Sequence, residues 1–153
     1  MTKFLLSVHV LAAIIAIGPV TVAAGAFPAS TRRALAAPGD EREVAVLRAL
    51  HRTCRVYAAV GVAVPVFGLA TANSLGVLGD AWLLTSIALT ALAAAVIVLL
   101  ILPRQGAVLG DVVASRTPTW PPSRLAAHTG VFNLLWAAVT VLMVVRPGST
   151  TGA

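Results

Sequence analysis

Three histidines, one cysteine and two methionines are the side chains in this chain that could bind a transition metal or haem iron. His9, His51, His128 and Cys54 offer imidazole and thiolate groups, and Met143 offers a thioether. The spacing from His51 to His128 matches no compact metal motif. A single cysteine allows no intrachain disulfide, so it does not indicate a redox compartment. The chemistry of these groups therefore depends on the elements that carry them.

Four apolar stretches dominate the chain, at residues 4–25, 56–78, 81–102 and 125–145. A hydrocarbon core of about 30 Å requires roughly 20 predominantly apolar helical residues, and no charged side chain falls inside any of the four stretches. The composition agrees, with 59% hydrophobic residues, 10% charged residues and a mean hydropathy of +0.96. The sequence therefore predicts an all-α bundle of four transmembrane helices, in which residues 1–153 form one integral membrane domain.

Basic residues are distributed unequally between the connections. Six arginines lie between the first two stretches and three lie between the last two, namely Arg32, Arg33, Arg42, Arg48, Arg52, Arg55, Arg104, Arg116 and Arg124. The other side carries only Lys3, Asp80 and Arg146. The positive-inside rule then predicts a multi-pass protein of the cell inner (plasma) membrane with both termini outside the cytoplasm. Because the positive charge follows this rule, we expect the lipid bilayer, and no nucleic acid, as a partner.

The connection before the second stretch has the pattern of a helix. Asp40 can cap a helix, with Glu43 at the capping-box spacing. Neither glycine nor proline occurs between Glu41 and Val60, so we expect a helix that extends from the cytoplasm into the second span without a break. Pro65 would kink it.

The connection after the third stretch is rich in helix breakers. We expect Pro103 to bend or end the third helix, and a short interfacial segment at residues 106–116. Residues 117–122 should be irregular, with Ser123 as the cap of the fourth helix. The chain would then form two helical hairpins. A weak echo between residues 48–51 and 124–128, each with Arg and His, fits either a duplicated hairpin or chance.

His9 is the imidazole that lies deepest in a predicted span, about five residues or roughly 8 Å from its outer end. Ionisable groups at such depth usually face the bundle interior and have a partner. One interpretation makes His9 a ligand of haem b or a transition metal, with Met143 as a second axial ligand. The other is a hydrogen bond to Thr71 or Ser86 that holds helices together.

Small residues also follow one stripe of the second helix. Gly61, Pro65 and Gly68 are spaced at i, i+4 and i+7. This stripe could admit a flat cofactor against the backbone, or it could let helices pack closely, and we favour packing.

A polar layer is expected at the cytoplasmic end of the spans, where His128 should lie at the level of Tyr57, with His51 and Cys54 a turn or two below. His51 and His128 are secondary ligand candidates. Alternatively, His51 is a solvated residue and His128 bonds a backbone carbonyl or Tyr57.

The first span carries a family resemblance. Residues 3–13, followed by Gly18, contain the pattern Leu-x-x-His-x-x-x-Ala/Gly. This opening resembles that of a bacterial family of predicted four-helix integral membrane proteins, a domain of unknown function, and is more distantly similar to copper-resistance protein D and HemJ-type protoporphyrinogen oxidase. The resemblance implies that His9 ligates haem b or a metal. The chain lacks the aromatic residue two turns after that histidine and the third-span lysine of the HemJ pattern.

Motifs of soluble enzymes do not occur in the sequence: it has no paired carboxylates in the spans, no phosphate-binding loop and no nucleophile elbow. Three function classes follow. The first is an accessory or structural subunit whose small-residue faces bind other membrane proteins or a second copy, and whose basic arms bind anionic lipid or a cytosolic partner. The second is a haem- or metal-binding protein that uses His9 in electron transfer or cofactor handling. The third is a small transporter. We place an accessory or binding role ahead of enzymatic action.

Overall fold

The computed structural model describes residues 2–148, which form helices and turns with no strand among them. The elements are α1 (Thr2–Ala36), α2 (Glu41–Val60), α3 (Ala63–Leu75), α4 (Ala81–Ala95), the π-helix η1 (Val96–Ile101), α5 (Leu102–Val113) and α6 (Pro122–Val145). Because α2 runs into α3, and α4 runs through η1 into α5, these elements make four rods of 35, 35, 33 and 24 residues. Each rod is long and apolar enough to cross a membrane. The all-α, four-helix prediction is confirmed.

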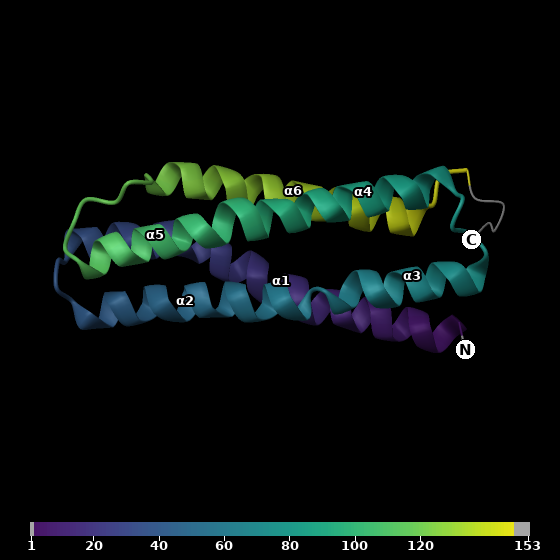
Figure 1. Ribbon diagram of the computed structural model, residues 1–153, viewed down its shortest axis with the longest axis horizontal. Coiled ribbons are helices and arrows are strands. Elements are labelled where there is room, and N and C mark those ends of the chain that lie inside the picture. The colour runs from purple at the N-terminus through teal and green to yellow at the C-terminus, as the bar shows by residue number, and fades with distance from the viewer. Residues whose placement is uncertain (1, 149–153) are drawn as a thin grey trace.

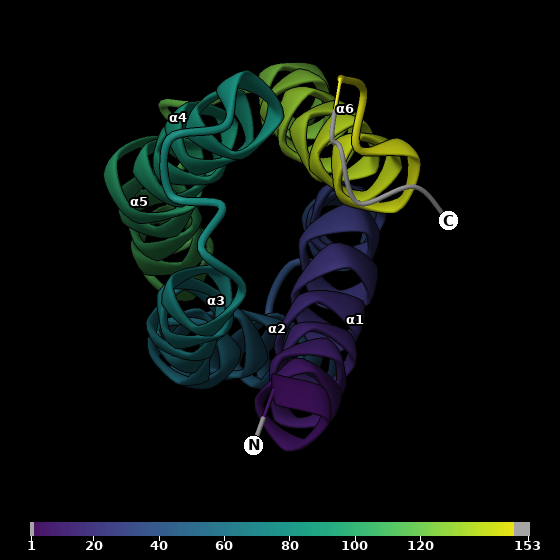
Figure 2. The same ribbon diagram turned by 90° about the vertical axis from the view of Figure 1, so that its right-hand side faces the viewer.

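The four rods lie around a common axis (Figure 2). α1 packs against α2, α3 and α6, while α6 also packs against α4 and η1. α2 packs against α5, which closes the ring. Figure 1 shows both chain ends at one end of this bundle, with the α1–α2 and α5–α6 connections at the other. We call these the terminal end and the arginine-rich end.

Helix α2 begins as predicted at Asp40, whose carboxylate oxygen Oδ1 accepts a hydrogen bond of 2.8 Å from the Arg42 backbone N–H. The capping box does not form, because the Asp40 N–H donates to the carbonyl of Ala37 and Glu43 pairs with Arg33 at 3.5 Å. The helix then continues through residues 51–55, which confirms the prediction of an unbroken stretch there.

The second rod breaks at Gly61 and Val62 rather than at Pro65 itself. Proline has no N–H, so the carbonyl four residues earlier, that of Gly61, loses its usual helical donor. In the structure the Val64 N–H bonds this carbonyl instead, at 3.1 Å. The sequence thus identified the cause of the break, which appears one turn earlier than predicted.

Pro103 neither bends the third rod out of the bundle nor ends it. The six-residue π-helix η1 precedes it and α5 continues to Val113, so the predicted interfacial segment at 106–116 belongs mostly to this rod. Residues 117–121 are irregular, as predicted. The prediction that Ser123 caps the last helix is wrong, because α6 begins at Pro122, where the missing proline N–H costs nothing.

The core follows the bundle axis in three clusters. Its central part joins α1, α2, α4, η1 and α6 through buried apolar side chains, namely Val20, Ala23, Ala24, Cys54, Ala93, Val96, Ile97, Ile101 and Phe132. Several of these are alanines, so the helices approach closely. Cys54 is wholly buried here and packs as a small apolar residue.

Candidate functional site

His9 is buried in the bundle, with 8% of its surface exposed, and faces α3. Its Nδ1 lies 2.9 Å from the carbonyl oxygen of Val64. A carbonyl oxygen only accepts, so Nδ1 of His9 carries the hydrogen and donates it to Val64. The expected hydrogen bond between helices exists, but its acceptor is a backbone group and neither Thr71 nor Ser86.

Gly68 makes room for this imidazole. A Cβ placed on Gly68 would lie 2.9 Å from Cε1 and 3.1 Å from Nδ1 of His9. Real Cβ atoms essentially never approach other atoms so closely. The small-residue stripe of the second rod therefore admits a flat ring against the backbone, and that ring is the side chain of His9 from α1.

The hydroxyl groups near the terminal end bond to their own helices. Thr71, Thr85, Ser86 and Thr140 each donate to the carbonyl four residues earlier, at 2.7–2.9 Å. Such bonds within one helix satisfy the hydroxyl but do not join it to a neighbour. These four hydroxyls therefore form no hydrogen-bonded network with His9.

Met143 packs against a separate cluster at the terminal end that contains Ala72, Trp82 and Leu83. Its backbone carbonyl accepts a hydrogen bond of 3.3 Å from Nε of Arg146, whose guanidinium lies 5.6 Å from the centre of the Trp82 ring. Within residues 2–148, no hydrogen bond joins Met143 to His9. The axial pair of His9 and Met143 stays a prediction.

A connected polar cluster lies nearer the arginine-rich end, around Gln105 of α5. Gln105 is 1% exposed. Its Oε1 accepts from Nδ1 of His51 at 3.2 Å, and its Nε2 donates to Sγ of Cys54 at 3.7 Å. The secondary candidates His51 and Cys54, both from α2, thus meet through one amide side chain from α5.

His128 joins the neighbouring residue of α5. Nη1 of Arg104 donates to Nε2 of His128 at 2.7 Å, and Nδ1 of His128 donates to the backbone carbonyl of Arg124. The Arg104 guanidinium also lies 4.3 Å from the centre of the Trp120 ring. The predicted bond from His128 to a backbone carbonyl is confirmed. The alternative partner, Tyr57, does not bond His128.

Two consecutive residues of α5 therefore bond the two secondary candidates: Arg104 bonds His128, and Gln105 bonds His51. His51 and His128 bond different partners and do not bond each other. The described residues 2–148 contain no group of three or more His, Cys, Asp or Glu side chains that could hold a metal ion.

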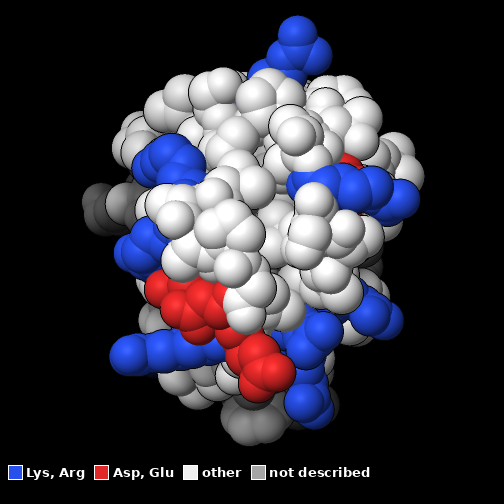
Figure 3. Space-filling model, turned by 90° about the vertical axis from the view of Figure 1, so that its left-hand side faces the viewer, with Lys and Arg blue, Asp and Glu red and all other residues white. Residues whose placement is uncertain are grey.

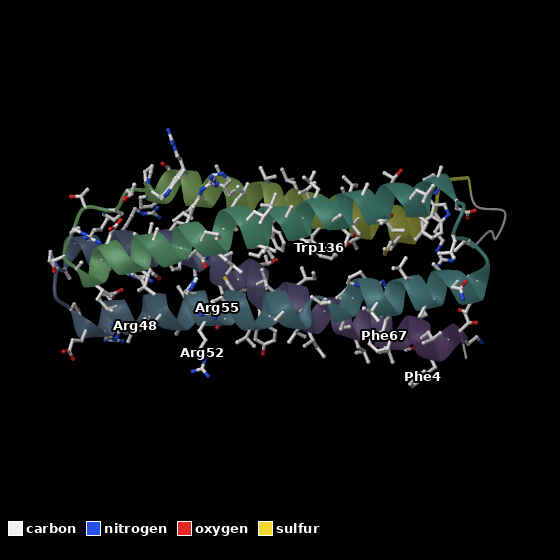
Figure 4. The ribbon with its side chains drawn as sticks, viewed as in Figure 1. Phe4, Arg48, Arg52, Arg55, Phe67 and Trp136 are labelled. Carbon is white, nitrogen blue, oxygen red and sulfur yellow. The ribbon has the colours of Figure 1, made fainter. Side chains whose placement is uncertain are left out.

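Sequence reasoning missed four polar residues of the interior: Arg104, Gln105, Asn133 and Trp136. Asn133 lies inside the fourth span, so polarity at depth was the available signal for it, whereas Gln105, the only glutamine of the sequence, lies three residues beyond the third apolar stretch. Oδ1 of Asn133 and Nε1 of Trp136 are buried and have no hydrogen-bond partner in the described part of the chain. Figure 4 shows Trp136 between the rods.

Comparisons of the chain with family models, curated proteins and solved structures find no match.

Proposed function

We propose that this protein is an accessory or structural subunit of a membrane assembly, and that an outward face of α1 binds another transmembrane helix. The observation that carries this proposal is a stripe on α1 composed of Leu11, Ile15, Gly18, Val22 and Gly25. Its spacing, i, i+4, i+7, i+11 and i+14, places these residues on one side of the helix. All five are exposed, with Val22 at 70%.

The two glycines of this stripe do not serve packing within the bundle. A Cβ on Gly18 or on Gly25 would meet no atom within 4 Å, in contrast to Gly68. Small residues at membrane helix interfaces let two backbones approach closely, and this approach is a main source of their association. A partner helix, from another protein or a second copy of this chain, would use the space that the glycines leave.

Photo-cross-linking in native membranes tests this proposal. A photoreactive residue at Val22, between the two glycines, should yield a discrete protein adduct, while the same group at Leu134 on α6, 72% exposed, should yield lipid adducts. The double variant Gly18→Leu/Gly25→Leu should abolish the protein adduct, because the new side chains hold a partner helix away. Gly110→Leu on α5 is the control, since Gly110 is also exposed and a Cβ there also meets nothing within 4 Å.

The proposal fails if Val22 yields only lipid adducts. It also fails if a protein adduct at Val22 persists undiminished in the Gly18→Leu/Gly25→Leu variant. Neither result depends on whether the protein binds a cofactor.

A haem- or metal-binding role for His9 is the second candidate, and one observation favours it. Ligating histidines usually donate their other ring N–H to a carbonyl or carboxylate, and Nδ1 of His9 donates in this way to Val64. Visible spectra and metal analysis of purified wild type and His9→Ala would decide the matter. Bound haem or metal should be lost in the variant, and retention in full would exclude His9 as a ligand. The transporter class has no comparable support in the contacts of the described residues.

For the orientation, we propose that the arginine-rich end lies in the cytoplasm, with both termini on the other side of the inner membrane. Three rods of 33–35 residues are about 50 Å long, so they exceed a hydrocarbon core of about 30 Å. The excess would extend into the cytoplasm at the arginine-rich end, α2 included. A reporter that is active only outside the cytoplasm should be active when fused at Ala153; activity solely of a cytoplasmic reporter there would reverse the orientation.

A further inference from the structure

Most of the positive charge lies at one end of the bundle, where Figure 3 shows basic side chains around the rim, with an acidic patch beside some of them. Nine of the 11 basic residues belong to this end. In residues 2–148 only two ion pairs form, Arg33 with Glu43 and Arg116 with Asp111. Arg48, Arg52 and Arg55 of α2 are exposed and take part in neither pair.

These three arginines line an open groove along α2 with a volume of about 550 Å³, to which α5 contributes Leu109. The groove is lined by Arg48, His51, Arg52, Arg55, Val56, Ala59 and Leu109. Arg48, Arg52, Arg55 and Ala59 follow one another at i, i+4, i+7 and i+11, so they form a stripe along α2. Figure 4 shows the labelled arginines on α2, with Arg52 pointing away from the bundle.

The groove is basic at one end and apolar at the other. The basic residues extend from Arg48 to Arg55, and the two residues that follow on this face, Val56 and Ala59, are exposed and apolar. Val56 is also the first residue of the apolar stretch that the sequence predicts as the second span. The cationic part therefore lies at the boundary of the hydrocarbon, and the apolar part lies within it.

We propose that this groove binds an anionic phospholipid, with its phosphate headgroup on Arg48, Arg52 and Arg55 and an acyl chain along Val56 and Ala59. Guanidinium groups bind phosphate oxygens through paired hydrogen bonds, and basic pockets beside membrane helices select anionic headgroups. A soluble phosphate compound would use the arginines but not the apolar part. This inference requires that the rods cross a bilayer, and it does not depend on the accessory-subunit proposal.

Native mass spectrometry of the full chain in detergent micelles tests the site. The protein is titrated with dioleoylphosphatidylglycerol and, separately, with zwitterionic dioleoylphosphatidylcholine. Wild type should prefer the anionic lipid, and Arg52→Gln/Arg55→Gln should weaken its binding roughly 10- to 30-fold, because each arginine near an anionic surface contributes about 1 kcal/mol. The control Arg32→Gln/Arg42→Gln removes the same charge from exposed residues outside the groove and should change binding less than about 3-fold.

The groove is overturned as a site if both double variants lose the same affinity, because the effect would then be one of overall charge. It is equally overturned if neither variant loses affinity. A competition arm separates the two sources of phosphate: displacement of the lipid by millimolar inorganic phosphate or glycerol 3-phosphate would assign the arginines to a soluble ligand. Thermal unfolding of the groove variant should match that of wild type, since both side chains are exposed.

Discussion

The two ends of the bundle use polar side chains in different ways. At the terminal end, the Thr71 and Ser86 hydroxyls each bond a carbonyl of their own helix, and His9 bonds a single backbone carbonyl of another helix. At the arginine-rich end, side chains of α2, α5 and α6 are linked through Arg104 and Gln105, and further arginines remain uncovered on α2.

This difference fits our proposal that the arginine-rich end extends beyond the hydrocarbon into the cytoplasm, whereas His9 lies within the hydrocarbon. Inside hydrocarbon, a polar group without a partner costs several kcal/mol, so short bonds within one helix are the simplest solution. Near the membrane surface, charged side chains remain partly solvated, so they can join helices and still bind an external ligand. The terminal end therefore depends on close packing, and the arginine-rich end depends on electrostatic contacts.

The claim that close packing stabilises the terminal end is tested most severely at Gly68. Gly68→Ala should destabilise the bundle by about 1–3 kcal/mol, because the new Cβ displaces the His9 ring and breaks its bond to Val64. Gly130→Ala, where a Cβ meets nothing within 4 Å, should be neutral or slightly stabilising. The measurement is the free energy of unfolding in mixed micelles, followed by circular dichroism.

The double variant His9→Ala/Gly68→Ala sharpens this test. Without the imidazole ring of His9, the new methyl group at position 68 has nothing to clash with. The loss of stability in the double variant should therefore be smaller than the sum of the losses in the two single variants. If Gly68→Ala unfolds with the same free energy as Gly130→Ala, the close approach of His9 does not matter for stability.

A smaller effect is expected at Gln105, which tests how much the buried polar contacts near the arginine-rich end contribute to stability. Gln105→Ala should lower the free energy of unfolding by about 1–2 kcal/mol, because it removes the contacts to His51 and Cys54 and leaves space in the core. The same unfolding assay applies. His51→Ala should cost less, since His51 is only half-buried, and a larger loss for His51 than for Gln105 would contradict this account.

The smallest effect is expected at Arg104. Arg104→Lys keeps the charge but loses the planar contact with Trp120 and the bond to His128, so we expect a loss of about 0.5–1 kcal/mol. Arg116→Lys is the control, because the Arg116 side chain is 69% exposed and its ion pair with Asp111 should survive the change to lysine with almost no loss. Equal losses in the two variants would mean that the contacts of Arg104 are no stronger than a surface ion pair.

Most of the fold could be predicted from the sequence, since the position of apolar residues alone fixes which segments can cross a bilayer. The four spans and the start of α2 at Asp40 were predicted in this way, and so was the unbroken helix before Val56. The errors concern local backbone chemistry: Pro65 broke its helix one turn earlier, Pro103 was accommodated within a helical rod, and Pro122 displaced Ser123 from the cap.

For the candidate site, the sequence predicted only how deep in its span each residue lies. Rise per residue places His9 near Gly68, and His51 near Cys54, without a structure. It does not determine which way a side chain faces, because that depends on how each helix is rotated about its axis.

The sequence by itself determined that this is a four-helix membrane protein whose positive charge lies at one end, because hydrophobicity and charge act residue by residue. Only the tertiary structure decided the partners: His9 bonds a carbonyl and fills the space at Gly68, Gln105 bonds His51 and Cys54, and the glycines of α1 remain outside the bundle. Helix rotation and packing set these contacts, and they depend on all four rods at once.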